Sequence, residues 1–459
     1  MLVHIHFGAE GLLPWALYLA MWVGFAASVI WRPSVGLFIL AFSLPMQTGR
    51  YKIHDFFLGS QFVDILLLGA ILGLIFKGDG ISLKLPLNSY LLILAIFLYF
   101  SLWEGSFFVN APLPLWISDA RFSNWKNYVE MFLLASVVAC SLKDKRHIWF
   151  MIVTMCISAL IVNRNYYALM SGRNLTSFSE DIRDSGLLGY AGVNGLAAFE
   201  AMFASFLLGI YVSTKHFLIK ICLLFVLSSC IYCLLFSFSR GGYAGFLAGM
   251  MIIGLLRSRK ILVIACIVIV GWQLILPASV QQRIAMTTGE VASGAKFDSS
   301  SEERLTLWKD ALNLFERNPV TGTGFDTYGS LGRVGPYRDT HNYYVKVLVE
   351  TGLVGLALFL ILLRRIWGLG WSLHVSTDDP FWSALSLGFI ALVACAAVVN
   401  LFGDRWTYQQ VDGYLWILLG CCMRGLVTSR DRPPHDAVLE ELRSVSDSDL
   451  AVMAYDYER

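Results

Sequence analysis

Long apolar segments alternate with short polar ones along almost the whole chain. A transmembrane α-helix needs about 20 mostly apolar residues, and most of these segments approach or exceed that length. They lie at residues 11–31, 33–47, 56–76, 87–103, 126–142, 147–163, 186–213, 217–238, 241–256, 260–277, 343–363, 382–400 and 410–427. The pattern predicts an all-α polytopic membrane protein with twelve or thirteen transmembrane helices. The number is open by one, because the short run 33–47 begins at Pro33 and is compatible with half of a re-entrant hairpin.

Composition and charge agree with this class and narrow the functions. The chain has 459 residues, of which 57% are hydrophobic and only 15% are charged, as in a membrane protein. Its net charge of +2 gives no basic surface for a nucleic acid. All nine cysteines fall inside or at the ends of apolar runs, so they form neither a disulfide framework nor a zinc pattern.

Lysine and arginine in the short loops predict the orientation and four regions. Loops rich in these residues, such as 143–146 and 257–260, are expected in the cytoplasm. On this scheme the polar stretch before Asn342 and the short turn at Arg240 are extracytoplasmic. The predicted regions are an N-terminal transmembrane bundle (1–276), an extracytoplasmic helical cap (277–342), C-terminal transmembrane helices (343–427) and a cytosolic tail (428–459).

The cap contains an amphipathic helix that carries Arg304. Ser300 and Glu303 have the spacing of a capping box, and Asn318-Pro319 ends the helix. The expected apolar stripe consists of Leu305, Trp308, Leu312 and Phe315. A guanidinium near the positive end of a helix dipole suits a phosphate group. Arg304 is therefore a candidate phosphate ligand, with an exposed arginine that only makes the helix soluble as the equally weighted alternative.

Arg240 is a second candidate, because it stands between two apolar runs with almost no loop around it. A lone arginine at this depth often only extends its side chain to the membrane interface. Gly241 and Gly242 favour a function slightly, since residues without side chains let a bulky ligand approach the backbone.

His341 comes directly before the apolar run that opens at Tyr343. If Asp339 or Thr340 caps the helix, His341 lies in the first helical turn, where the dipole favours a neutral imidazole that can act as a general base. The alternative is a polar residue at the membrane interface. In the same run, Lys346 and Glu350 are spaced to form an ion pair.

The remaining motifs point away from nucleotide and metal chemistry. Gly322-x-Gly324 has no preceding strand, so it does not predict a nucleotide fold. No cluster of metal ligands or hydrolase motif is present in the sequence. A reaction would then use arginines where other enzymes use a divalent cation, so we expect no metal and no cofactor.

Three of these segments together resemble a known family. ERLTLWKDALNLFERNPVTGTGFDTYG, HNYYVKVLVETGLVGLALF and the upstream FSRGG are similar to the O-antigen ligase and polymerase superfamily of bacterial envelope glycosyltransferases. The resemblance is strong from Ser237 to Leu360. Its most specific parts are Arg-x-x-x-Trp, Asn-Pro-x-x-Gly-x-Gly-Phe, and His-Asn before a span with Glu-x-Gly.

The resemblance implies a lipid-sugar-dependent, GT-C-like, metal-independent glycosyltransferase in the bacterial inner membrane. Such an enzyme takes a glycan from undecaprenyl diphosphate on the periplasmic face and passes it to a hydroxyl of a glycan, lipid A core or protein. Its products belong to O-antigen, lipopolysaccharide or exopolysaccharide biosynthesis. By position, Arg240 and Arg304 would bind the diphosphate and His341 would act at the reacting hydroxyl, with support expected from Asp339, Asn342 and Glu350.

Two alternatives to a ligase-type transferase stay open in the sequence. A repeat-unit polysaccharide polymerase of the same superfamily differs only in the acceptor, and these motifs do not specify the acceptor. A transporter of lipid-linked glycans would instead carry charges and broken helices near the middle of the membrane, with repeat symmetry. In this chain the strongest candidates lie at one rim of the predicted bundle.

Overall fold

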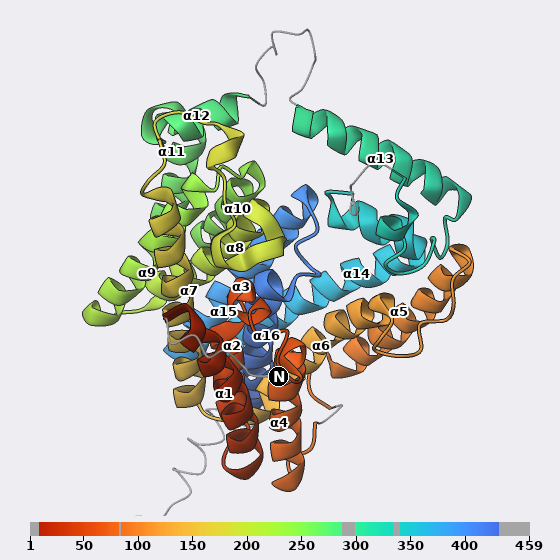
Figure 1. Cartoon of the computed structure of the whole chain (residues 1–459). Helices are drawn as coiled ribbons and strands as arrows, with labels where there is room; N and C mark the ends of the chain where they lie inside the picture. Colours follow the sequence, from red (N-terminus) through yellow and green to blue (C-terminus); the bar gives the residue numbers. More distant parts are fainter. Residues whose placement is uncertain (1–8, 82–83, 287–298, 334–339, 431–459) are drawn as a thin grey trace, which may run out of the picture.

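The computed structural model describes residues 9–81, 84–286, 299–333 and 340–430, and this part of the chain is a bundle of α-helices without β-strands (Figure 1). The class predicted from the apolar runs, all-α and polytopic, is confirmed. The N-terminal helices are α1 (Ala9–Ile30), α2 (Ser34–Ser43), α3 (Gln47–Tyr51), α4 (Phe62–Phe76), α5 (Asn88–Phe108), α6 (Ala120–Ser141) and α7 (Lys145–Met170). They are followed by α8 (Gly192–Ser213), α9 (Phe217–Phe236), α10 (Arg240–Leu256), α11 (Arg259–Ile275), α12 (Ala278–Ala285), α13 (Ser299–Arg317), α14 (Tyr343–Val375), α15 (Pro380–Val399) and α16 (Gln409–Arg430).

Nine helices of the described part are long and apolar enough to cross a membrane, or ten if the bent pair α11 and α12 forms one span. The other predicted spans correspond to α6, which carries several charges, and to the shorter apolar helices α2 and α10. With ten residues, α2 extends roughly 15 Å, about half the thickness of a bilayer core. Its length therefore matches the half-hairpin alternative better than a full crossing.

Three helices, α8, α15 and α16, form the centre of the bundle and are mostly buried. Small residues let these helices approach closely, as is common in membranes. A Cβ atom on Gly209 of α8 would lie 2.5 Å from the Cα atom of Gly388 of α15. On α10, a Cβ atom on Gly249 would lie 2.3 Å from the Ser205 hydroxyl of α8. This packing fixes α10, and with it Arg240 at its first position.

The amphipathic helix α13 packs along the first part of α14, at the upper right of Figure 1. Its buried face consists of Leu307, Ala311 and Leu314, which contact Tyr328 and Val349. The predicted stripe was displaced around the helix: Trp308 and Phe315 lie at the edge of this face, whereas Leu305 and Leu312 are exposed. The apolar residues of α13 cover a broad arc, and the position of Tyr328 and Val349 decides which part of that arc is buried.

The glycine-rich turn after α13 is held between α5 and a break in α14. Gly352 has φ of +64° inside α14, and the freed backbone bonds to the turn, with Leu353 N donating to Pro319 O (2.9 Å). In the turn itself Gly324 has φ of +99°, and a Cβ atom there would lie 2.1 Å from the Cα atom of Gly105. Only glycine lets the two backbone segments come this close.

Candidate functional site

Four arginines from distant parts of the chain line one small pocket: Arg183, Arg240, Arg283 and Arg304. Arg240 is the first residue of α10, Arg283 lies in α12, Arg304 lies in the second turn of α13, and Arg183 follows the 3-10 turn Glu180–Ile182. The structure thus brings the two predicted phosphate ligands, Arg240 and Arg304, to one place and adds two arginines. Among the described residues that line this pocket there is no Asp or Glu.

The start of α10 is fixed by Asn194, in the first turn of α8. Its Oδ1 atom accepts hydrogen bonds from Ser239 Oγ (2.8 Å) and Arg183 Nη2 (2.9 Å). Phe238 has φ of +54°, which turns the chain sharply from α9 into α10. One amide therefore orients both the helix that carries Arg240 and the side chain of Arg183.

The glycines after Arg240 serve packing, which corrects the expectation that they leave room for a ligand. A Cβ atom on Gly241 would lie 2.7 Å from Phe402 Cβ, and one on Gly242 would lie 2.9 Å from Ala197 Cβ. Both glycines already face protein, because α10 is pressed against α8 and the segment after α15.

Arg183 and Arg283 were missed by sequence reasoning, and Glu180 connects them. The two Glu180 carboxylate oxygens lie 2.9 Å from Arg183 Nη1 and 2.9 Å from Arg283 Nη1. The Arg283 guanidinium also lies over the Phe178 ring, 4.7 Å from its centroid. In the sequence, Arg183 is one of several mixed charges, and nothing marks its proximity to a helix about 100 residues later.

This arrangement is a candidate site for an anion. Four guanidiniums gather at this pocket, with Glu180 bridging two of them, and each guanidinium offers forked donors that match phosphate oxygens. The pocket has a volume of about 30 Å³.

His341 lies outside the first turn of α14, contrary to expectation. Asn342 is the N-cap, and its side-chain oxygen accepts hydrogen bonds from Tyr344 N (3.0 Å) and Val345 N (3.3 Å). His341 precedes this cap with φ of +51°, so the argument from the helix dipole does not apply to it. The predicted alternative cap, Asp339, lies outside the described residues.

A hydrogen bond ties the segment of His341 to the helix of Arg304. Trp308 Nε1, one turn after Arg304, donates to the carbonyl oxygen of Thr340 (2.9 Å). Thr340 is buried, and its hydroxyl donates to Asn342 O (2.6 Å). His341 is not among the residues that line the arginine pocket. The spacing Arg-x-x-x-Trp thus places a phosphate candidate and the anchor of the histidine segment on successive turns.

The prediction that Lys346 forms an ion pair with Glu350 is wrong. Lys346 Nζ instead lies 2.9 Å from Asp404 Oδ2, in the segment between α15 and α16. The Glu350 carboxylate accepts hydrogen bonds from the backbone N–H groups of Asp326 (3.1 Å) and Tyr328 (3.1 Å). Glu350 therefore holds the end of the glycine-rich turn, which explains why Glu-x-Gly and the turn motif occur together.

The chemistry available in the described part of the chain is that of arginines and a histidine. No group of three or more His, Cys, Asp or Glu side chains there is arranged to hold a metal ion. The arrangement can bind an anionic phosphate group and stabilise the charge that develops when that group departs.

The middle of the chain matches the model of a known family. Residues 223–360 match the model of a family described as O-antigen ligase. The match runs from α9 into α14 and includes Arg240, Arg283, Arg304 and His341. Arg183 and Asn194 lie before it. A search of curated proteins found no match.

Proposed function

Because residues 223–360 place this membrane protein in the O-antigen ligase and polymerase superfamily of polysaccharide biosynthesis, we propose that it is a metal-independent glycosyltransferase of the ligase type. The donor is a glycan on undecaprenyl diphosphate, and the acceptor is a hydroxyl group. The reaction takes place at the periplasmic face of the inner membrane. The departing lipid diphosphate carries the negative charge that the active site must stabilise.

The observation that carries this proposal is the convergence of Arg183, Arg240, Arg283 and Arg304 on one pocket. A diphosphate has several oxygens to share between guanidiniums, and two phosphate groups need more than one arginine for forked contacts. Positive groups fixed at the leaving group lower the transition-state energy, because charge develops there as the glycosidic bond breaks.

His341 is the residue we assign to the acceptor hydroxyl as general base. Its segment is anchored to α13 by the bond from Trp308 to Thr340, and it leads directly into α14. It therefore lies between the helix that carries Arg304 and the helix that carries Lys346. A base at this position takes the proton while the oxygen attacks the donor sugar.

Binding and transfer by the purified protein in proteoliposomes test this function. Undecaprenyl diphosphate is expected to bind the wild-type protein and to bind Arg304→Ala at least about 10-fold more weakly. Arg333→Ala is the matched control. Arg333 also lies in the predicted cap (277–342), but it pairs with Asp310 (2.9 Å) and does not line the pocket. Equal losses in both variants, or full activity of Arg304→Ala, would refute the pocket as the donor site.

A deletion strain separates the transferase alternatives. If the protein is a ligase, intact lipid-linked chains accumulate without reaching an acceptor. If it is a polymerase, long chains disappear and single repeats remain. Transfer in proteoliposomes with added chelator tests both metal independence and the transporter alternative, since a transporter moves the lipid-linked glycan without forming a new glycosidic bond.

Thiol labelling tests the periplasmic orientation. In a background without the exposed Cys222 and Cys266, a cysteine at Ser330 should react with a membrane-impermeant reagent in intact spheroplasts. A cysteine at Ser258 should stay unlabelled. The reverse result would exclude an active site on the periplasmic face.

A further inference from the structure

Arg405 is a buried arginine in the segment between α15 and α16 (residues 400–408). It is 8% exposed, and its backbone N–H donates to Asn400 Oδ1 (3.0 Å). Within the described part of the chain, its guanidinium takes part in no ion pair, hydrogen bond or aromatic contact. Arg283 is about equally buried, with 7% exposed, but it pairs with Glu180 (2.9 Å). Arg405 therefore lacks the partner that a comparably buried arginine has.

The aspartate next to Arg405 is engaged elsewhere. Asp404 Oδ2 contacts Lys346 Nζ (2.9 Å) and accepts a hydrogen bond from the Thr407 hydroxyl (2.7 Å). Asp404 Oδ1 accepts hydrogen bonds from the backbone N–H groups of Trp406 (3.2 Å) and Thr407 (3.1 Å). Burial of a charge without a partner is unfavourable, so an arginine in this state calls for a ligand of opposite charge.

The guanidinium of Arg405 folds back over Gly403. A Cβ atom on Gly403 would lie 2.5 Å from Arg405 Nη2, so the guanidinium lies against this glycine. Gly403 follows Phe402, which lines the arginine pocket and packs against Gly241, the residue after Arg240. Arg405 is itself not among the residues that line the arginine pocket. Its charge therefore lies next to that pocket but outside it.

The segment that carries Arg405 also reaches the start of α14, which His341 precedes. The carbonyl oxygen of Ala397, in the last turn of α15, accepts a hydrogen bond from the Tyr344 hydroxyl (2.9 Å). The turn Asn400–Phe402 packs against α14. Arg405 thus belongs to a segment that is held between the arginine pocket and the helix that begins after His341.

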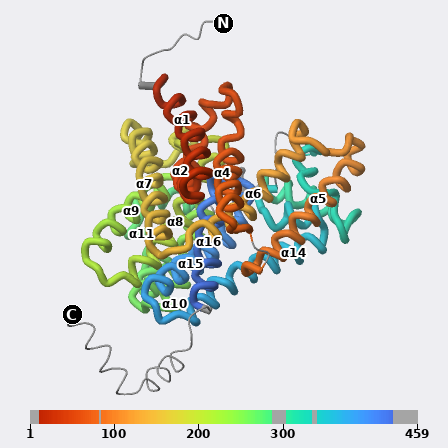
Figure 2. The backbone as a smooth tube through the Cα atoms, turned by 90° about the horizontal axis from the view of Figure 1, so that it is seen from below, coloured from red at the N-terminus to blue at the C-terminus, as the bar shows by residue number. Residues whose placement is uncertain are grey.

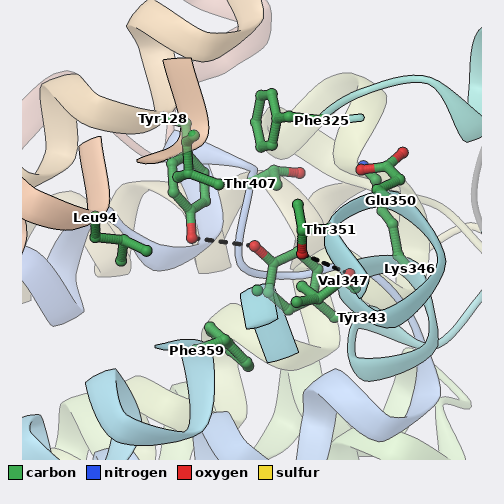
Figure 3. Close-up of a pocket in the computed structure, with 12 residues that line it drawn as sticks. Leu94, Tyr128, Phe325, Tyr343, Lys346, Val347, Glu350, Thr351, Phe359 and Thr407 are labelled. Carbon is green, nitrogen blue, oxygen red and sulfur yellow. Dashed lines mark hydrogen bonds between the residues drawn. The ribbon is translucent and has the colours of Figure 1, made fainter. Parts of the chain in front are cut away.

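Other residues of this segment line a second cavity of about 520 Å³, the polar cavity. Its wall combines aromatic rings, amide groups and paired charges. Tyr128, Phe325, Lys346 and Thr407 also line a smaller adjoining pocket, where Figure 3 shows them around the start of α14. Arg405 does not line the polar cavity either. Its guanidinium nitrogens are nevertheless not fully enclosed by protein, so a ligand can reach them.

With the roles proposed for the four arginines and His341, the part of the donor that lies between them is the sugar being transferred. Resting on the proposed function, we propose that this sugar is a hexuronic acid and that its carboxylate pairs with Arg405. The hydroxyl groups of a neutral sugar satisfy the N–H donors of a guanidinium but leave its charge unpaired, whereas a carboxylate matches both the fork and the charge. The contact selects the sugar and takes no part in the exchange of bonds at the anomeric carbon.

Binding of four synthetic donors tests this proposal. They are undecaprenyl diphosphates that carry a single glucuronate, galacturonate, glucose or galactose, so each uronate has a neutral counterpart that lacks only the carboxylate. The wild-type protein should bind at least one uronate donor about 10-fold more tightly than its neutral counterpart. Equal affinities within both pairs would overturn the acidic sugar.

Arg405→Gln removes the charge and should abolish the preference for the uronate. Its affinity for undecaprenyl diphosphate without a sugar should stay at the wild-type value. Arg333→Gln is the matched control, because Arg333 pairs with Asp310 (2.9 Å) and lines neither site, and it should keep the preference. If Arg405→Gln weakens the sugar-free diphosphate as much as the uronate donor, Arg405 is a phosphate ligand and the proposal is wrong. A preference that survives in Arg405→Gln overturns it as well.

Thermal unfolding in detergent without ligand checks that the charge of Arg405 is unpaired. Arg405→Gln should unfold at the same temperature as the wild type or at a higher one, because it removes an unfavourable buried charge. Lys346→Gln should unfold at a lower temperature, because it leaves Asp404 without its cation. A decrease in Arg405→Gln as large as that in Lys346→Gln would show that Arg405 has a partner within the protein, which contradicts the proposal.

The same measurements separate this proposal from the proposed function. If Arg304→Ala weakens all four donors and the wild type does not distinguish uronate from neutral sugar, the donor site stands and the acidic sugar fails. If the wild type prefers a uronate through Arg405 but Arg304→Ala binds every donor normally, the acidic sugar stands and the arginine pocket fails as the donor site.

Discussion

The arginine pocket and the polar cavity differ in size, charge and partners, although both are built at the starts of helices. The arginine pocket is about 30 Å³, and its described lining residues include four arginines and neither Asp nor Glu. The cavity is about 520 Å³, and its arginine and lysine are each paired with an aspartate. The first gathers positively charged side chains, whereas the second offers aromatic rings and hydrogen-bonding groups. Anionic groups suit the first and hydroxyl groups suit the second.

Figure 2 shows α5 and α14 on the right of the bundle. The glycine-rich turn is bonded to both helices: Phe325 N donates to Ser101 O of α5 (3.2 Å), and Leu353 N of α14 donates to Pro319 O (2.9 Å). Glu350 fixes the end of the turn that carries Phe325 and Asp326 to the cavity wall.

The largest expected effect concerns His341, which separates chemistry from binding. His341→Ala should lower transfer by about 10²–10⁴-fold and leave undecaprenyl diphosphate binding nearly unchanged, because a general base contributes to the transition state and His341 does not line the arginine pocket. Arg240→Ala should weaken both. Donor affinity and turnover of each purified variant decide this. Comparable losses of donor affinity in both variants would make His341 a phosphate ligand instead.

Gly324→Ala should damage the cavity more than the arginine pocket. The added Cβ atom would lie 2.1 Å from Gly105 Cα at φ of +99°, so the turn must move away from α5. We expect a loss of about 1–3 kcal/mol in stability. Gly332→Ala is the control, since its φ is +55° but no atom lies within 4 Å of the added Cβ. Thermal unfolding in detergent compares them, and equal shifts would argue that backbone strain alone is responsible.

Arg304→Lys should lower transfer at least about 10-fold, because lysine keeps the charge and loses the forked geometry. The KM for the acceptor is expected to stay at its wild-type value. Kinetics with each substrate varied in turn provide the measurement. Near-normal turnover at normal protein level would reduce Arg304 to a surface charge.

Glu180→Gln should have the smallest effect and the opposite sign. Glu180 bridges Arg183 and Arg283, and its side chain is 60% exposed, so it is a displaceable counter-ion of the pocket. Removing its charge should tighten undecaprenyl diphosphate binding about 3-fold, with the exposed neighbour Asp181→Asn as control. Weaker binding in Glu180→Gln would show that Glu180 positions the arginines for the ligand.

The sequence predicted the features that depend on local pattern. Apolar runs gave the class of fold, and the periodicity between Ser300 and Asn318 gave a helix that the structure places at Ser299–Arg317. Local pattern could not predict ion-pair partners that are distant in the chain. Lys346 pairs with Asp404, and Arg283 pairs with Glu180. It also misplaced the cap of α14, because Asp339, Thr340 and Asn342 are all plausible caps and tertiary contacts of Thr340 with Trp308 select Asn342. The roles of Arg240, Arg304 and His341 in catalysis stay predictions.

The hydrogen bond from Trp308 to Thr340 connects α13 to the residue that precedes His341. A helix is stiff over one turn, so a ligand that draws Arg304 inward also pulls the peptide that precedes His341. With the roles proposed for Arg304 and His341, this bond would couple donor binding to the position of the base. Trp308→Phe keeps the ring, removes the indole donor and cuts this linkage. In that variant, hydrolysis of the donor by water should rise relative to productive transfer, because the position of the base is no longer linked to α13.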